Sequence, residues 1–264
     1  METRNPIDLL THKRFDVVIK YLYASNLSSG FFKNAYKEHL GIWNGFTEDK
    51  RKKSTFEDFD NSFISMINNN VDEPVPVNPE GHLANGAHRL AAALYRQRPI
   101  NIRSTTKKEN YPIEADYKVF LRKGLQKHIL GRTALEYAKL KPNTHVICLF
   151  PIAHTRMDEV MNIIEKHSNI FYTSSEGLTA PGQIGLIKEI YLSEGWVSEK
   201  GIRKKCQQCF RGMAQVTFVL IDAKNLETVK EMKKEIRALF KVGNHSVHIN
   251  DYHVDTVRIA KTVF

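Results

Sequence analysis

Residues 81–97, GHLANGAHRLAAALYRQ, begin as a polar turn and end as an apolar helix, with an amide, a glycine, an imidazole and a guanidinium at the join. These residues are Asn85, Gly86, His88 and Arg89. The first turn of a helix leaves backbone N–H groups unpaired and carries a partial positive charge, so it attracts anions such as phosphate. The positive charge of Arg89 interacts unfavourably with the helix dipole at this end, and a nearby anion would offset that cost. The pattern is therefore compatible with a phosphate-binding turn.

The same residues also have a purely structural interpretation. Asn85 could cap the helix, Gly86 could supply a backbone conformation that other residues resist, and the two cationic side chains could face water. Local chemistry alone does not decide between the two interpretations.

A second group of polar residues lies in the stretch HSVHINDYH. Alternation along a strand would put His248 and Asn250 on one face, with Asp251 and His253 in the turn beyond. Zinc or magnesium could bind such groups, but the spacing matches no established metal motif, and ordinary polar residues are typical of a strand end. The roles of His245, His248, Asp251 and His253 therefore stay open.

The composition of the 264-residue chain is typical of a soluble globular protein, with 42% hydrophobic and 26% charged residues. No apolar run approaches the ~18 residues that span a bilayer, and the N-terminus METRNPIDLL lacks the pattern of a secretion signal. Three cysteines, including the lone C-x-x-C pair Cys206 and Cys209, predict neither a disulfide framework nor a zinc site. We therefore expect a cytoplasmic protein without a membrane span.

The formal net charge of +10 favours anionic partners. Nucleic acid, nucleotides and anionic lipid could all exploit this charge, and charge alone does not choose among them. Residues 50–53 read KRKK, although such runs are also typical of solvated loops. Further basic residues follow the quoted helix: Arg96, Arg98, Arg103, Lys107 and Lys108.

Hydrophobic periodicity predicts mostly helices in the first half of the chain. The predicted helices cover residues 14–24, 32–43, 56–70 and 116–140, besides the one after the phosphate-binding turn. Short strands are predicted at residues 75–77, 82–83 and 100–104. The Lys-Pro-Asn sequence at 141–143 is the predicted boundary of a first domain that covers residues 1–141.

Strands and helices alternate in the second half. Strands are predicted at residues 146–152, 170–173, 216–221 and 246–250, and helices at 156–167, 182–192, 201–210, 226–240 and from 252 onward. This alternation predicts a helix-covered mixed sheet with some parallel pairing. We expect an α/β protein whose second domain covers residues 142–264, with a further module beyond Phe264 left open.

The segment 56–104 resembles the core of the ParB/sulfiredoxin-like superfamily. A helix is followed by PVPVN, a glycine turn, NGAHRLAAALYRQ and a strand, which is similar to that superfamily's strand and its G-x-H-R or G-x-R-R helix start. Its members include DNA-partitioning nucleotide switches, sulfiredoxins and free-serine kinases. The resemblance implies a nucleotide-phosphate cradle that is formed by Asn85, Gly86, Ala87, His88 and Arg89.

Departures from the superfamily narrow the implied activity. Sulfiredoxins carry a reactive cysteine where this chain has Ala87, which disfavours peroxiredoxin repair. The serine kinases carry an aspartate where this chain has Asn85, and an amide does not hold a metal as a carboxylate does. Partitioning proteins append a helix-turn-helix DNA reader, and the alternating pattern after residue 141 does not resemble one.

The resemblance thus implies a small-molecule kinase that uses ATP or ADP, with Mg²⁺, to phosphorylate a hydroxylated metabolite. In the kinase relatives a base comes from an acidic residue upstream of the turn; Asp16 is the first candidate, with Glu38 and Glu48 as others. Asp16 and Lys20 share a helical face at i,i+4 spacing, so they could equally form an exposed ion pair. With His88 they are the expected catalytic residues. The alternative is a nucleic-acid-binding or nucleotide-sensing protein without catalysis; the metal ligands and oligomeric state are not predicted.

Overall fold

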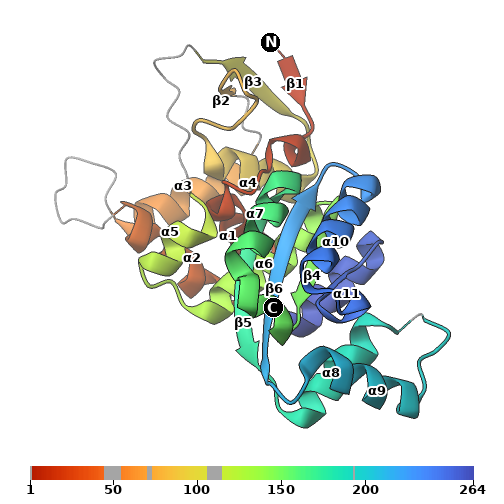
Figure 1. Ribbon diagram of the computed structural model, residues 1–264. Coiled ribbons are helices and arrows are strands. Elements are labelled where there is room, and N and C mark those ends of the chain that lie inside the picture. The colour runs from red at the N-terminus through yellow and green to blue at the C-terminus, as the bar shows by residue number, and fades with distance from the viewer. Residues whose placement is uncertain (1, 45–54, 70–72, 106–114, 193) are drawn as a thin grey trace. The chain divides into compact units, whose positions relative to one another are not determined.

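The computed structural model describes residues 2–44, 55–69, 73–105, 115–192 and 194–264 (Figure 1). The chain divides into two compact units, Met1–Glu136 and Tyr137–Phe264, and each contains helices and one sheet. The fold is therefore mixed α/β, as predicted. The division falls inside a helix rather than at the Lys-Pro-Asn sequence that follows it. None of the described helices has the length and apolar character needed to cross a membrane.

The first unit packs helices beside a three-stranded sheet of order β1-β3-β2. Strand β3 pairs antiparallel with β1 and parallel with β2. Helix α1 contacts α2 and α4, and α3 also contacts α4. The elements are β1 (Glu2–Arg4), η1 (Pro6–Leu9), α1 (Phe15–Ala24), α2 (Gly30–Asn44), α3 (Phe56–Asn68), β2 (Val75–Val77), α4 (Ala87–Arg96), β3 (Ile100–Ser104), α5 (Tyr117–Arg122) and α6 (Lys127–Leu140).

Helix α1 is the centre of this unit. Nearly all of its residues are buried, so it is covered on every side rather than along one stripe. An aromatic cluster joins it to its neighbours: Tyr23 stacks on Tyr36 of α2 with ring centroids 4.7 Å apart, and Phe63 of α3 contacts both rings. The helices that carry the predicted site are therefore held by one continuous core.

Two features of the first unit differ from the sequence prediction. The single helix expected over residues 116–140 is broken into α5 and α6, because Gly124 between them adopts a left-handed conformation with φ of +89°. Strand β1 was not predicted, because three residues carry too little pattern and its partner β3 lies far along the chain. The strand predicted at 82–83 is an isolated bridge between Val77 and Leu83.

The second unit is a four-stranded sheet of order β5-β6-β4-β7, covered by helices. Strand β4 is buried at every position, which requires cover on both faces of the sheet. Helices α7 and α10 contact each other, and α11 packs against β4. The elements are β4 (Thr144–Leu149), η3 (Pro151–Arg156), α7 (Met157–His167), β5 (Ser168–Gly177), α8 (Ala180–Ile190), α9 (Glu199–Phe210), β6 (Gln215–Ala223), α10 (Leu226–Phe240), η4 (Gly243–His245), β7 (Val247–Ile249) and α11 (His253–Val263).

The mixed sheet expected in the second unit is wrong, because every hydrogen-bonded pair in it is antiparallel. Strands β4 and β5 flank a helix and run in the same direction, as the alternation predicts, but β6 lies between them. In the same way, β4 lies between β6 and β7. Each β-α-β unit is thus split by a strand of opposite direction, an arrangement that local periodicity cannot reveal.

Asn250 joins the end of β7 to β4 and to the start of α11. Its Oδ1 accepts from the backbone N–H of Val146 at 2.7 Å, and its Nδ2 donates to Thr256 Oγ1 at 2.7 Å and to the carbonyl of Tyr252 at 2.8 Å. The hydroxyl of Thr256 donates in turn to the carbonyl of Thr144 at 2.5 Å. Asn250 is 4% exposed, so these groups have little access to water.

Replacement of Asn250 by alanine is expected to destabilise the protein by about 1–3 kcal/mol, because it leaves buried backbone and hydroxyl groups without partners. Urea unfolding followed by circular dichroism measures the change. Asn244→Ala, at an exposed position in η4, is the matched control and is expected to stay within about 0.5 kcal/mol of the unchanged protein. Equal effects of the two substitutions would contradict the assignment.

Candidate functional site

The first unit contains a pocket of about 270 Å³ at the start of α4. The residues of the expected phosphate cradle and the expected catalytic residues line it: Asp16, Lys20, Asn85, Gly86, Ala87, His88 and Arg89. These residues come from two elements that are far apart in sequence, α1 and the turn before α4. The helix contact between α1 and α4 brings them together.

Gly86 provides the backbone geometry of the turn. It is the N-cap of α4 with φ of +94°, a conformation that side chains resist. Asn85 does not cap the helix, since its Oδ1 accepts from the neighbouring N–H of Gly86 at 2.6 Å instead. Among the described residues no side chain caps the first turn of α4. The first-turn N–H groups of the helix are therefore left for water or for an anion.

Arg89 is held toward its own chain in this structure. Its Nη1 donates to the carbonyl of Pro74 at 3.1 Å and forms an ion pair with Glu73 Oε1 at 3.0 Å. The Arg89 side chain is 13% exposed, whereas that of Glu73 is 76% exposed. An ion pair with so exposed a partner is worth less than about 1 kcal/mol. Arg89 therefore lines the pocket, and its counter-ion Glu73 is exposed to water and holds it only weakly.

His88 lies among aromatic side chains. Its Nε2 is 2.9 Å from the hydroxyl of Tyr36, and its ring contacts the ring of Phe63 edge-on with centroids 4.9 Å apart. Burial raises the pKa of Tyr36, so the tyrosine hydroxyl stays protonated at neutral pH. The imidazole is thereby fixed in orientation at the pocket wall.

Asp16 is the centre of a buried ion cluster. Arg14 donates to its two carboxylate oxygens at 2.9 and 3.0 Å, and Lys20 donates to Oδ2 at 3.1 Å. All three residues are 2–3% exposed. Arg14 also donates to the carbonyl of Leu83, and Lys20 Nζ is 3.4 Å from Nε2 of His39. The predicted pairing of Asp16 with Lys20 is present, but it is buried rather than exposed.

The electrostatics of this cluster weigh against the general-base role expected of Asp16. Burial alone would raise the pKa of Asp16, but the charges of Arg14 and Lys20 outweigh it and hold the pKa well below its usual value. A carboxylate with such a low pKa is a poor proton acceptor. Burial lowers the pKa of Lys20, and the Asp16 carboxylate offsets part of that effect. Asp16 therefore holds Arg14 and Lys20 at the pocket wall.

The other acidic candidates do not replace Asp16. Glu38 is not among the residues that line the pocket, and it accepts from the backbone and side chain of Gln126. Glu48 and the KRKK run at 50–53 lie outside the described residues, as do Lys107 and Lys108. Sequence reasoning missed Arg14, whose position before α1 carries no motif, and the apolar wall of Leu40, Trp43, Phe59 and Met66.

The polar residues of the second half are placed in different surroundings. His248 lines a pocket of the second unit, Asp251 pairs with Lys233 at 2.8 Å, and His253 Nε2 lies 2.7 Å from the carbonyl of Ala138. His245 Nδ1 lies 3.3 Å from Lys205 Nζ. Within the described part of the chain, no His, Cys, Asp and Glu side chains are grouped so as to hold a metal ion. The three cysteines are free and buried.

Comparison with known proteins assigns no family to the chain. No protein-family model matches it, and no curated protein matches its sequence. Among solved structures, the nucleoside diphosphate kinase of Aquifex aeolicus is similar at 13% identity with a TM-score of 0.34, and the match covers 46% of this chain and 94% of that one. A likeness at this TM-score carries no argument about activity, so the function has to be inferred from the site itself.

Replacement of Gly86 by alanine is expected to destabilise the protein by at least about 2 kcal/mol, as measured by urea unfolding. The left-handed backbone disfavours a side chain, and a Cβ there would lie 2.7 Å from Val75 Cγ1. Gly124→Ala is the control, since Gly124 has φ of +89° but nothing within 4 Å of its Cβ position. Its cost should be only about 1 kcal/mol. Equal losses would show that the contact with Val75 is unimportant.

Replacement of Asp16 by asparagine is expected to destabilise the protein by about 3–5 kcal/mol at pH 7, because Arg14 and Lys20 are left as buried charges without a counter-charge. Since the pKa of Asp16 is lowered in the folded protein, its contribution is fully present above the unfolded carboxyl pKa of about 4 and is lost as the pH falls further. Urea midpoints between about pH 7 and pH 3 should therefore vary less in Asp16→Asn.

The control for this pH series is Glu57→Gln, an exposed carboxylate at the start of α3. It should leave the acid dependence of stability almost unchanged. An Asp16→Asn protein as stable as the unchanged chain at pH 7 would contradict the importance of the ion cluster.

Proposed function

We propose that the first unit binds the phosphate groups of ATP or ADP in the α1–α4 pocket and transfers a phosphoryl group to a hydroxyl of a small metabolite. The observation that carries this proposal is the meeting of an uncapped helix N-terminus with three cations, Arg14, Lys20 and Arg89, in one pocket. N–H groups and cations that converge on one space are the arrangement that stabilises phosphoryl oxygens. The resemblance of residues 56–104 to the ParB/sulfiredoxin-like superfamily supports the same ligand.

Arg89 has to exchange its partner when phosphate binds. Its ion pair with the exposed Glu73 is weak, whereas a forked arrangement of guanidinium and phosphate adds charge-assisted hydrogen bonds of about 1.5–3 kcal/mol. The exchange is therefore favourable. Lys20 and Arg14 are already fixed by Asp16, so they require little rearrangement. Leu40, Trp43, Phe59 and Met66 offer an apolar wall for the nucleoside.

In the proposed reaction the bond between the terminal phosphorus and its bridging oxygen breaks, and a bond from that phosphorus to the acceptor hydroxyl oxygen forms. We assign the hydroxyl proton to His88 in place of Asp16. The Tyr36 hydroxyl, 2.9 Å from Nε2, holds the ring at the pocket wall, and the imidazole of His88 accepts the proton. Asp16 acts as a positioning residue for Arg14 and Lys20.

The described residues of this pocket do not fit a resident Mg²⁺. Asp16 is the one carboxylate that lines it, and both of its oxygens already accept from Arg14 and Lys20. Asn85, which stands where the serine kinases have an aspartate, offers only an amide. Mg²⁺ therefore enters the proposal only as a counter-ion that the nucleotide carries, and no step depends on it.

Replacement of Arg89 by glutamine is expected to weaken ATP or ADP binding at least about tenfold, because the phosphate loses a charge-assisted hydrogen bond. Isothermal titration calorimetry on the full chain measures the change. Arg122→Gln, which removes an exposed arginine of α5, is the matched control and should bind as the unchanged protein does. Unaltered nucleotide affinity in folded Arg89→Gln would contradict the proposed site.

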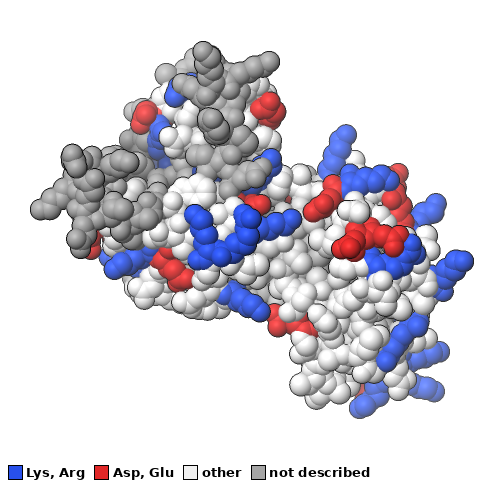
Figure 2. All heavy atoms as spheres, turned by 60° about the vertical axis from the view of Figure 1, so that its left-hand side comes forward, with Lys and Arg blue, Asp and Glu red and all other residues white. Residues whose placement is uncertain are grey.

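A second experiment distinguishes the kinase proposal from nucleic-acid binding and from nucleotide sensing. Thermal-shift measurements with ATP, ADP, CTP and a DNA duplex should show stabilisation by nucleotides; stabilisation by DNA alone, with a steep dependence on salt, would replace the kinase proposal by nucleic-acid binding. On the face in Figure 2, Lys and Arg side chains of the described residues lie with Asp and Glu side chains among them. Nucleotide binding without phosphoryl transfer to any hydroxylated metabolite would indicate a sensor.

A further inference from the structure

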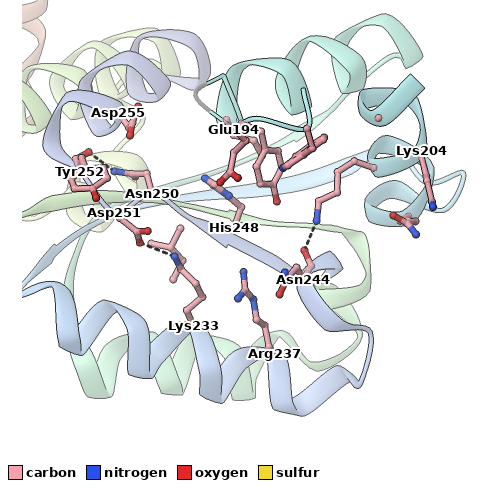
Figure 3. A pocket seen from close by; sticks show the side chains of 17 residues that line it. Glu194, Lys204, Lys233, Arg237, Asn244, His248, Asn250, Asp251, Tyr252 and Asp255 are labelled. Carbon is pink, nitrogen blue, oxygen red and sulfur yellow. Dashed lines mark hydrogen bonds and ion pairs between the residues drawn. The ribbon is translucent and has the colours of Figure 1, made fainter. Parts of the chain in front are cut away.

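The second unit contains a pocket of about 480 Å³ that the proposed function does not use (Figure 3). It lies among α8, α9, α10 and the end of β7. In Figure 3, Lys233 and Arg237 extend from α10 toward the middle of the pocket, where His248 of β7 lies, and Lys204 lies on α9 at the far side. Tyr191, Trp196 and Tyr252 add aromatic surface to its walls.

The charged side chains of this pocket are unevenly paired. The carboxylate of Asp251 pairs with Lys233 at 2.8 Å, and that of Asp255 pairs with Arg258 at 2.8 Å. Glu194 also lines the pocket. Among the described residues, neither Lys205 nor Arg237 forms an ion pair with a carboxylate. Lys205 and Arg237 therefore face this space without an ion-pair partner in the described part of the chain, and the carboxylates of Glu194 and Asp251 act on them only from a distance.

The contacts of Lys205 and Arg237 do not compensate for the missing carboxylate partner. Lys205 Nζ donates to the carbonyl of Asn244 at 3.1 Å, lies 3.3 Å from His245 Nδ1 and lies over the ring of Tyr191. Nε of Arg237 is buried and has no hydrogen-bond partner within the described parts of the chain. Burial lowers the pKa of both side chains, which reflects the cost of withdrawing a cation from water. An anion in the pocket would remove that cost.

His248 adds a second unsatisfied group. Its ring meets the ring of Tyr191 edge-on with centroids 4.7 Å apart, and its Nε2 is buried without a hydrogen-bond partner among the described residues. Burial, with a smaller contribution from the charge of Lys233, lowers the pKa of His248 to about 3. The imidazole is therefore neutral at pH 7 and does not add to the repulsion among the cations.

We propose that this pocket of the second unit is a binding site for a phosphorylated small molecule, with Arg237 and Lys205 binding the phosphate and His248 lying at its base. A phosphate oxyanion is matched by a guanidinium fork and an ammonium group that reach it from different helices, α10 and α9. Trp196 and Tyr252, which are 38% and 67% exposed, provide flat surfaces at the rim for the rest of the ligand. The site lies wholly within the second unit and does not depend on the proposed nucleotide pocket.

Calorimetric titration of the full chain with inorganic tripolyphosphate, ATP and adenosine tests this site. The titrations use the Arg89→Gln background, so that binding at the first pocket is weakened and contributes little to the measured heat. Tripolyphosphate and ATP are expected to bind, and Arg237→Gln in that background is expected to weaken both at least about tenfold. Lys205→Gln is a second variant with the same expectation. Lys234→Gln, an exposed lysine on the same helix that does not line the pocket, is the control and should leave binding unchanged.

Several results would overturn the proposal. One is the absence of tripolyphosphate binding in the Arg89→Gln background; another is unchanged binding in both folded variants, with folding checked by circular dichroism. Adenosine that binds as tightly as ATP would show that the pocket recognises a base and not phosphate. In support, the ring nitrogen resonances of His248 should shift on addition of tripolyphosphate, and those of His128 in the first unit should not. The effects of Arg237→Gln and Lys205→Gln in this background report on the second pocket alone, whether or not the first pocket binds nucleotide.

Discussion

A positive charge that is withdrawn from water needs a negative partner, and this requirement governs both units of the protein. In the first unit Asp16 meets it for Arg14 and Lys20, so that all three side chains are almost inaccessible to solvent. In the second unit Arg237 and Lys205 are partly buried and no carboxylate of the described chain pairs with them. In the first arrangement one carboxylate serves two cations and leaves one positive charge in excess, whereas in the second the two cations have no paired carboxylate among the described residues.

The helical packing of the first unit follows from the same cluster. Arg14 precedes α1, Asp16 and Lys20 lie on it, and Arg14 also donates to the carbonyl of Leu83 beside the turn that leads into α4. One carboxylate therefore fixes the approach of that turn to α1. The aromatic cluster of Tyr23, Tyr36 and Phe63 closes the other side and orients His88. The pocket results from packing that the core already demands.

Local pattern predicted most of the helices and strands. The features that it missed depend on pairing between segments that lie far apart in the sequence. The periodicity of α1 and the i,i+4 spacing of Asp16 and Lys20 were sufficient to place those side chains on one face. The role of Asp16 depends on burial and on Arg14, and neither follows from that spacing. The sheet of the second unit was predicted as mixed because each helix joins strands of equal direction, whereas the strand inserted between them is set by the whole fold.

The candidate sites were predictable to different degrees. The turn from Asn85 to Arg89 carries a recognisable sequence, and the structure adds Arg14 and an apolar wall that carry none. The cations of the second pocket come from α9 and α10, and their meeting with His248 of β7 depends on tertiary packing. The sequence left the roles of the histidine-rich stretch open, and its members face different neighbours: a lysine, a carbonyl and an aromatic ring.

The contact between Glu73 and Arg89 has a consequence for how the first pocket responds to its surroundings. Glu73 forms an ion pair with the Arg89 guanidinium in the absence of a ligand. A phosphate can therefore pair with Arg89 only when the ion pair between Arg89 and Glu73 breaks. Dissolved ions screen the bond that is broken as well as the bond that is made. The exposed carboxylate thus acts as a weak intramolecular competitor: it competes with weakly held anions for Arg89 and reduces the dependence of occupancy on ionic strength.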